Sequence, residues 1–154
     1  MTFDNVRVPV HNRIGDEGQG WKYANFLLGN ERTSYAHVAG KRMQMAAIDQ
    51  FLVSIDDIEY RSRFDNLSIR LDCLDITVLR VLATVANGAS PGDESSILKI
   101  LATELAQDIT ELGMSVRQYY STASFSAEMP DRAAARATVD YLGTRSQSIY
   151  GGAN

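Results

Sequence analysis

The sequence predicts an all-α fold, a four-helix bundle preceded by a short extended N-terminal arm. Two observations predict it. Apolar residues recur at intervals of three and four over long stretches after Trp21, and clusters of Gly, Pro, Ser and Asn divide those stretches into four. The 154 residues, of which 45% are apolar and 22% charged, are enough for one domain with a buried core.

The first ten residues have a different pattern. Val6, Val8 and Val10 lie at alternate positions, which is the period of a short half-buried strand. Such a strand is either an arm across the domain or part of a sheet that lies upstream. Residues 15–20 (GDEGQG) follow as a connector, because they lack the Lys-Ser/Thr ending of a phosphate loop and the spacing of a dinucleotide fingerprint.

The first helical stretch is expected from Trp21 to about Ser54, with a candidate break near Gly29. Small residues interleave with its apolar ones and allow neighbouring helices to approach closely. The apolar residues of this stretch are Tyr23, Leu27, Tyr35, Val38, Met45, Ile48 and Leu52.

The second stretch, about 59–87, has the most regular pattern in the chain. Its apolar residues step by four and three in alternation, as in a bundle core, and Asn87-Gly88 is a good helix stop. These residues are Leu67, Leu71, Leu74, Val78, Val81 and Val85.

The third stretch opens with Ser95 or Ser96 as its cap and ends near Tyr120. Its core residues are Leu98, Leu101, Leu105, Ile109, Leu112, Val116 and Tyr119. The fourth stretch, about 131–147, is rich in alanine and has a thinner apolar face. That face consists of Ala134, Val139 and Leu142.

Composition excludes several classes of partner. The net charge is −4 and no basic face is apparent, so neither nucleic acid nor a lipid surface is expected. No apolar run approaches the roughly 20 residues of a membrane span. The single cysteine, Cys73, lies in an apolar helical pattern and is expected to be a buried small hydrophobe rather than a reactive thiol. Without a signal peptide or disulfides, the expected location is cytoplasmic.

The residues alone say little about chemistry. His11 and His37 have no second ligand at metal-binding spacing. The charged Glu31-Arg32 pair follows Gly29 and Asn30 in a helix of small residues. It is either a solvated face, which the pattern alone favours, or a carboxylate held beside an arginine in a cleft.

Two segments resemble a known family. Residues 3–9 (FDNVRVP) followed by 15–21 resemble the junction at which acyl-CoA dehydrogenases pass from a middle β-domain into a C-terminal helical bundle. Residues 148–154 (SIYGGAN) resemble the family's substrate-binding turn, and residues 96–99 and 141–145 resemble family segments in corresponding places. The resemblance spans the whole chain. It implies α,β-dehydrogenation of an acyl-CoA thioester, FAD as cofactor and an electron-accepting flavoprotein as partner.

The resemblance also implies a domain organisation. Residues 1–20 correspond to an arm from a missing middle β-domain, and residues 21–154 to a C-terminal bundle that stops inside a motif. The chain then looks like an excised piece, with Met1 an added start, and it is expected to be inactive alone and to bind little flavin. Because the family's bundles form dimers and tetramers, a homo- or hetero-oligomer is expected.

The resemblance implies site residues too. Some members place the catalytic base directly after an Ile-Tyr pair, where this chain has Gly151, which cannot act as a base. Others place it on the first bundle helix before an arginine, where this chain has Glu31. Glu31 is thus the candidate base, and the alternative is that it only pairs with Arg32. The remaining implied residues are Gly29, Asn30, Arg32, Gly151 and Gly152 for the substrate, with Gly151 offering its N–H to the thioester carbonyl, and Ala153 and Asn154 for the flavin.

The chain departs from the family pattern at the flavin. Arg61 opens the nearest counterpart, residues 61–65, of an Arg-x-x-Phe-Gly run that reaches the flavin pyrophosphate, but the glycine is absent. Residues 121–130 have no Gly-Gly-x-Gly segment. A non-catalytic bundle subunit of a heteromeric acyl-CoA dehydrogenase, serving oligomerisation, is therefore the alternative. A helical interaction domain unconnected with flavin is a third.

Overall fold

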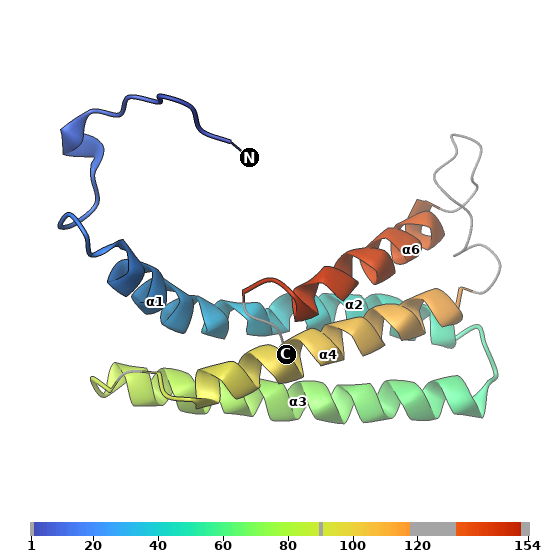
Figure 1. Ribbon diagram of the computed structural model, residues 1–154. Helices are drawn as coiled ribbons and strands as arrows, with labels where there is room; N and C mark the ends of the chain where they lie inside the picture. The colour runs from blue at the N-terminus through green and yellow to red at the C-terminus, as the bar shows by residue number, and fades with distance from the viewer. Residues whose placement is uncertain (1, 90, 118–131, 152–154) are drawn as a thin grey trace.

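The structure, a computed structural model, describes residues 2–89, 91–117 and 132–151, and for residues 29–33 and 132–135 it describes the backbone only (Figure 1). These residues form α-helices and short 3-10 helices, without a strand among them, which confirms the predicted all-α fold. In chain order the elements are η1 (Val10–Asn12), α1 (Gly20–Glu31), η2 (Arg32–Ala36), α2 (Val38–Leu52), α3 (Ile58–Ala86), α4 (Glu94–Ser115), α6 (Arg132–Arg145) and η3 (Ser146–Ser148).

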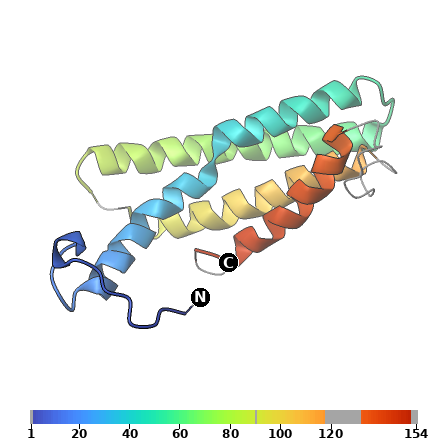
Figure 2. The same ribbon diagram turned by 90° about the horizontal axis from the view of Figure 1, so that it is seen from above.

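Four helices make the bundle. Helix α4 is central, since it packs against η2, α2, α3 and α6 (Figures 1 and 2). It carries most of the fully buried side chains, among them Leu98, Ile109 and Leu112. Most residues of the predicted stripes of α3 and α4 lie in the core, which confirms the helical periodicity on which they were based. The core residues are Met45, Ile48, Leu52, Leu67, Leu71, Leu74, Val81, Leu98, Ala102, Leu105, Ile109, Leu112 and Val116.

Helix ends follow local chemistry at α3 and depart from the prediction at α4. The Asp57 side chain accepts hydrogen bonds from the N–H groups of Glu59 (2.8 Å) and Tyr60 (3.3 Å), which starts α3. The helix stops at Gly88, whose φ of +84° suits glycine. The predicted cap of α4 was wrong: the helix starts at Glu94, and Ser95 is buried with its hydroxyl donated to the Gly92 carbonyl.

The break expected near Gly29 is present, two residues after it. Helix α1 runs on to Glu31, since an interior glycine costs only about 1 kcal/mol relative to alanine. The 3-10 helix η2 follows, and the chain turns at His37, whose φ is +37°, before α2 begins. The imidazole of His37 lies over Gly40, where a Cβ would collide with it. Gly40 therefore leaves the room that this turn requires.

The predicted burial was wrong on α3, α4 and α6 and at Cys73. Val85 on α3 and Leu101 on α4 are 37% and 43% exposed. On α6 the expected core residues Val139 and Leu142 are 47% and 63% exposed, while Ala137 and Thr144 are buried instead. The Thr144 hydroxyl hydrogen-bonds that of Thr110 on α4 at 3.0 Å, so a polar contact sets the rotation of α6. Cys73 is exposed, because it lies on the side of α3 that turns away from the core.

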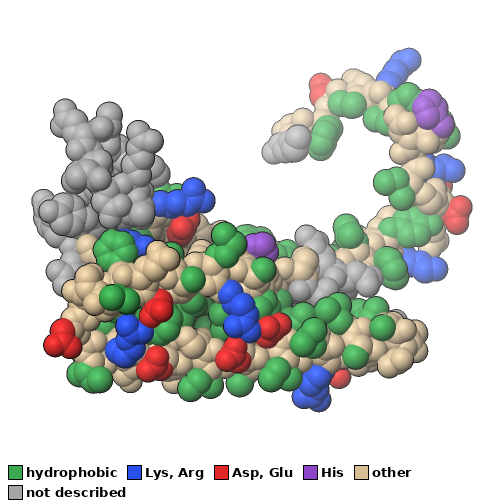
Figure 3. Space-filling model, turned by 180° about the vertical axis from the view of Figure 1, so that it is seen from behind, with side chains coloured by type: hydrophobic (Ala, Val, Ile, Leu, Met, Phe, Trp, Pro, Cys, Tyr) green, Lys and Arg blue, Asp and Glu red, His purple; other side chains and the backbone are tan. Residues whose placement is uncertain are grey.

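The N-terminal arm stands away from the bundle (Figures 1 and 3). Residues 2–19 form η1 and turns, so the predicted strand is not formed within them. Apolar side chains of the arm and of α1 are exposed, including Val8 and Trp21, the latter 77% exposed. Within the described residues, none of the helices has both the length and the apolar character needed to cross a membrane.

Candidate functional site

A cavity of about 320 Å³ lies where η2 and α2 meet α4, α6 and the C-terminal turn. We call it the junction cavity. Its lining residues are Ser34, Tyr35, His37, Gly40, Lys41, Gln44, Ala106, Thr144, Gln147 and Tyr150. Most of these side chains carry hydrogen-bonding groups, so the cavity is polar although it borders the core.

Two tyrosines join the segments that the sequence marked as the substrate site. The rings of Tyr35 on η2 and Tyr150 in the C-terminal turn lie 5.9 Å apart, centroid to centroid, at 45°. Gly151 follows with a φ of +69°, and a Cβ placed there would lie 2.5 Å from the Tyr35 hydroxyl oxygen. Only glycine fits this position without displacement or backbone strain.

The predicted substrate residues occupy both sides of this contact. Gly29, Asn30 and Glu31 form the last turn of α1, and Arg32 opens η2, which packs against α4. Residues 29–32 thus lead directly into the 3-10 helix whose Tyr35 contacts the turn at Gly151. Gly152, Ala153 and Asn154 lie outside the described residues, and their roles stay predictions.

Hydrogen bonds to α4 hold the C-terminal turn in place. Gln107 on α4 donates its side-chain amide to the Ser148 hydroxyl, and it also bonds the Thr144 carbonyl at 3.3 Å. The Arg145 guanidinium donates to the Gln107 carbonyl at 3.0 Å. Since Tyr150 is the second residue after η3, these contacts position its ring against Tyr35.

Lys41 is the functional candidate that sequence reasoning missed. It is 4% exposed, and its Nζ donates to the Ala36 carbonyl at 2.7 Å. Burial lowers the pKa of Lys41 to about 8 because the charged form loses hydration. A lysine among the small residues at 36, 39, 40, 46 and 47 was the available signal, since small residues mark a helix covered by its neighbours.

Arg61 does not join this site. It lies near the start of α3, where its guanidinium donates to Asp49 of α2 at 2.7 Å and stacks over the Phe64 ring at 5.4 Å. That end of the bundle is remote from η2 and the C-terminal turn (Figures 1 and 2). Residues 121–130, where the adenine-binding segment was missing, lie outside the described residues. The described residues therefore do not make a flavin site by themselves.

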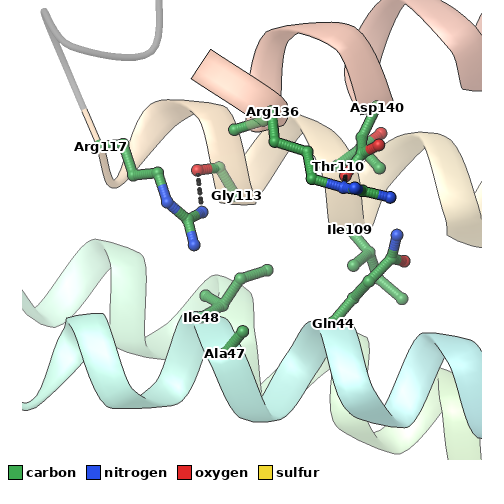
Figure 4. Close-up of a pocket in the computed structure, with 10 residues that line it drawn as sticks. Gln44, Ala47, Ile48, Ile109, Thr110, Gly113, Arg117, Arg136 and Asp140 are labelled. Atoms are coloured by element: carbon green, nitrogen blue, oxygen red, sulfur yellow. Dashed lines mark hydrogen bonds and ion pairs between the residues drawn. The ribbon is translucent and has the colours of Figure 1, made fainter. Parts of the chain in front are cut away.

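A second cavity of about 190 Å³ lies between α2, α4 and α6 (Figure 4). Gln44 lines both cavities, and the Thr110–Thr144 hydrogen bond lies between them. In Figure 4 Ile48 and Gln44 reach from α2 toward α4, and Arg117 donates to the Gly113 carbonyl at 2.7 Å. None of the site residues predicted from the sequence lines this second cavity. Among the described residues there is no cluster of three or more potential metal ligands either.

Known proteins similar to this chain agree with the fold. Residues 18–154 match the family model described as acyl-CoA dehydrogenase, C-terminal domain. The acyl-CoA dehydrogenase FadE34 of Mycobacterium tuberculosis is 26% identical over 151 residues, which cover 97% of this chain and 20% of the relative. FadE26 of the same organism, also an acyl-CoA dehydrogenase, is 26% identical over 127 residues, 74% of this chain and 32% of the relative. The chain thus spans about a fifth and a third of these relatives. It belongs to the acyl-CoA dehydrogenase family, in which it corresponds to the C-terminal helical domain.

Proposed function

We propose that the chain is part of an FAD-dependent enzyme that dehydrogenates an acyl-CoA thioester between its α and β carbons, with Glu31 as the base. One observation carries the proposal. The Tyr35–Tyr150 contact holds η2, which follows Glu31 directly, against the turn at Gly151. We infer from this that the Glu31 carboxylate and the Gly151 backbone N–H, which come from distant parts of the sequence, act on one substrate.

Each part of the proposed site has a chemical role. The Glu31 carboxylate takes the α-proton, and the Gly151 N–H donates to the thioester oxygen, where negative charge develops. Gly29, Asn30 and Arg32 line the acyl-CoA site, and Gly152 allows close approach of the backbone. FAD, when bound, supplies the acceptor of the β-hydride, and an electron-accepting flavoprotein then reoxidises it.

The flavin site is proposed to be completed by protein outside this chain. Ala153 and Asn154 are the proposed flavin contacts from the bundle, with Arg61 as a weaker candidate because Asp49 already pairs with it. We assign residues 1–20 as an arm from a middle β-domain and residues 21–154 as the bundle. The exposed apolar side chains of the arm and of α1, such as Val8, Trp21 and Phe26, support a further domain packed there.

Self-association of the bundle is the second part of the proposal. Exposed aliphatic side chains line the outer side of α3 and the start of α4, and Figure 3 shows hydrophobic side chains toward this end of the molecule. We call them the outer apolar face: Ile69, Ile76, Leu79, Leu82, Ile97, Ile100 and Leu101. A face of this kind is typical of an interface between subunits, either identical or different.

The cytoplasmic location expected from the sequence stays a prediction.

The test uses the full-length protein in which this domain occurs, with and without Glu31→Gln. Acyl-CoA thioesters are added without oxygen, and the visible absorbance of the flavin is followed. We expect the wild type to bleach and the variant to keep its flavin but bleach about 100-fold to 10,000-fold more slowly. Equal bleaching of both would show that the base lies elsewhere. A flavin-loaded wild type that no acyl-CoA bleaches would overturn the dehydrogenase proposal.

One observation favours the alternative of a non-catalytic subunit in a heteromeric enzyme. Within the described residues the single candidate for the flavin pyrophosphate, Arg61, is held by Asp49. If this alternative holds, the full-length protein carries flavin only when a second subunit is co-expressed, and Glu31→Gln leaves the rate unchanged. In both cases the isolated chain is expected to bind little flavin, and a yellow sample with stoichiometric FAD would contradict this.

A further inference from the structure

The junction cavity contains a buried lysine, Lys41, and none of its described lining residues carries a carboxylate. Among the ten described residues that line it there is no Asp or Glu, and Lys41 is its only Lys or Arg. The lining also includes neutral side chains that can donate hydrogen bonds, such as the amides of Gln44 and Gln147. The cavity is thus lined with donors and carries one positive charge.

Arg42, the next residue of α2, differs from Lys41 because it is paired with carboxylates. The Arg42 guanidinium is exposed and donates to two carboxylates of α3, Asp72 at 3.0 Å and Asp75 at 2.8 Å. Lys41 is buried, and among the described residues its hydrogen-bond acceptor is a neutral carbonyl, that of Ala36. An ammonium group has three N–H donors, so two remain for an acceptor in the cavity. Burial of an uncompensated charge is costly, and a bound anion would compensate it.

The cavity also lies at the right place for a substrate. Tyr35 lines the cavity and packs against the Tyr150 ring. It also occupies the position next to Gly151 where a side chain would otherwise lie. A group in the cavity is therefore one side chain away from the turn proposed to hold the thioester. A volume of about 320 Å³ admits the end of an organic chain with its polar group.

We propose that the junction cavity binds a carboxylate carried by the acyl chain of the substrate, with Lys41 as its ion-pair partner and the surrounding hydroxyls and amides as further donors. This rests on the proposed function and names its substrate class, an acyl-CoA whose acyl chain bears an acidic group. A lysine that pairs with a carboxylate away from water makes a strong, charge-assisted hydrogen bond. Lys41 then determines specificity without taking part in proton removal.

The kinetic test compares carboxylated with plain substrates on the full-length enzyme. Adipoyl-, suberoyl- and sebacoyl-CoA are assayed against hexanoyl-, octanoyl- and decanoyl-CoA, and the ratio of kcat/KM is taken for each pair. We expect Lys41→Met to lower this ratio about 10-fold to 100-fold, the effect of losing a hydrogen bond to a charged group. Lys22→Met, which removes an exposed lysine of α1, is the matched control and should keep the wild-type ratio. An unchanged ratio in Lys41→Met would overturn the inference while the dehydrogenase proposal stands.

A binding measurement separates this inference from the proposed function. Calorimetric titration of the same protein with pentanoate and with pentanamide measures whether a carboxylate is bound, independently of any enzymatic turnover. We expect pentanoate to bind more tightly than the amide, and Lys41→Met or Lys41→Gln to abolish that difference in protein that melts cooperatively. Equal binding of pentanoate and pentanamide, or binding of inorganic phosphate as tight as that of pentanoate, would overturn the assignment. If pentanoate binds through Lys41 but no acyl-CoA reduces the flavin, it is the proposed function that fails.

Discussion

Tyr35 and Gly151 lie so close that a methyl group on Gly151 would stand 2.5 Å from the Tyr35 hydroxyl oxygen. The two residues are more than a hundred positions apart in the sequence. Tyr35 is four residues after Glu31, the proposed base. The contact therefore ties the segment that follows Glu31 to the turn that is proposed to hold the thioester. Alterations on either side of it test whether this junction is the functional centre of the domain.

Gly151→Ala is expected to open the junction. Alanine at a φ of +69° costs about 1–2 kcal/mol, and the added methyl group must displace the Tyr35 ring. We expect the unfolding free energy of the chain to fall by up to that amount and the Tyr35 and Tyr150 ring signals to shift in NMR spectra. In the full-length enzyme the rate of flavin reduction should fall as well.

Gly143→Ala is the matched control for that change. Gly143 lies inside α6, and a Cβ there meets no atom within 4 Å. Alanine should stabilise the helix by about 0.5–1 kcal/mol and leave the ring signals unchanged. Loss of stability in Gly143→Ala equal to that in Gly151→Ala would remove the contact with Tyr35 as the explanation.

Lys41→Met should stabilise the chain at neutral pH. Burial lowers the pKa of Lys41 from 10.5 to about 8, so the folded state binds fewer protons than the unfolded state between these two values. The stability of the wild type therefore rises with pH across this window, and below it the buried charge is unfavourable. Methionine removes that charge and should raise the unfolding free energy at pH 7 by about 1–3 kcal/mol.

The advantage of Lys41→Met should shrink as the pH rises from about 8 toward 10.5, because the wild-type lysine then loses its own charge. Denaturant unfolding at several pH values measures this for the wild type, Lys41→Met and Lys22→Met. A pH-independent difference between the wild type and Lys41→Met would show that Lys41 is not charged and buried at neutral pH.

Gly40→Ala should destabilise, although glycine is a poor helix former. Alanine in an open helix position gains about 1 kcal/mol, but the Cβ at Gly40 would collide with the His37 imidazole. His37→Gly removes both the ring and a non-glycine residue at a φ of +37°. We expect the double variant to be more stable than Gly40→Ala alone, with a coupling of about 0.5–3 kcal/mol in a double-mutant cycle. Additive effects of the two changes would contradict the contact.

Leu79→Glu should weaken self-association, since it places a charge among the side chains of the outer apolar face. Sedimentation velocity of the full-length protein over a range of concentrations measures the effect. Met43→Glu, at an exposed apolar position on α2, is the control and should leave the assembly intact. The same oligomer in both variants would show that this face is not an interface.

Local sequence information was sufficient to predict that the helices form. The apolar stripe from Leu67 to Val81 and, except for Leu101, the one from Leu98 to Val116 lie in the core, because a residue's position around a helix is set by its distance along the chain. The stop at Gly88 is equally local, since it depends on the backbone freedom of one residue. The family resemblance, carried by short segments in a fixed order, was sufficient for the class of protein.

Contacts between distant residues decided what the sequence could not. The face of α6 depends on the Thr110–Thr144 hydrogen bond, so Val139 and Leu142 turned outward against their hydrophobicity. The break at His37 needs the open space over Gly40, and the site needs Tyr35 beside Gly151. The burial of Lys41 depends on the helices around it and is invisible in its own segment. Periodicity along one helix carries no information about what packs against it, and it is packing that turns a lysine among small residues into a buried charge.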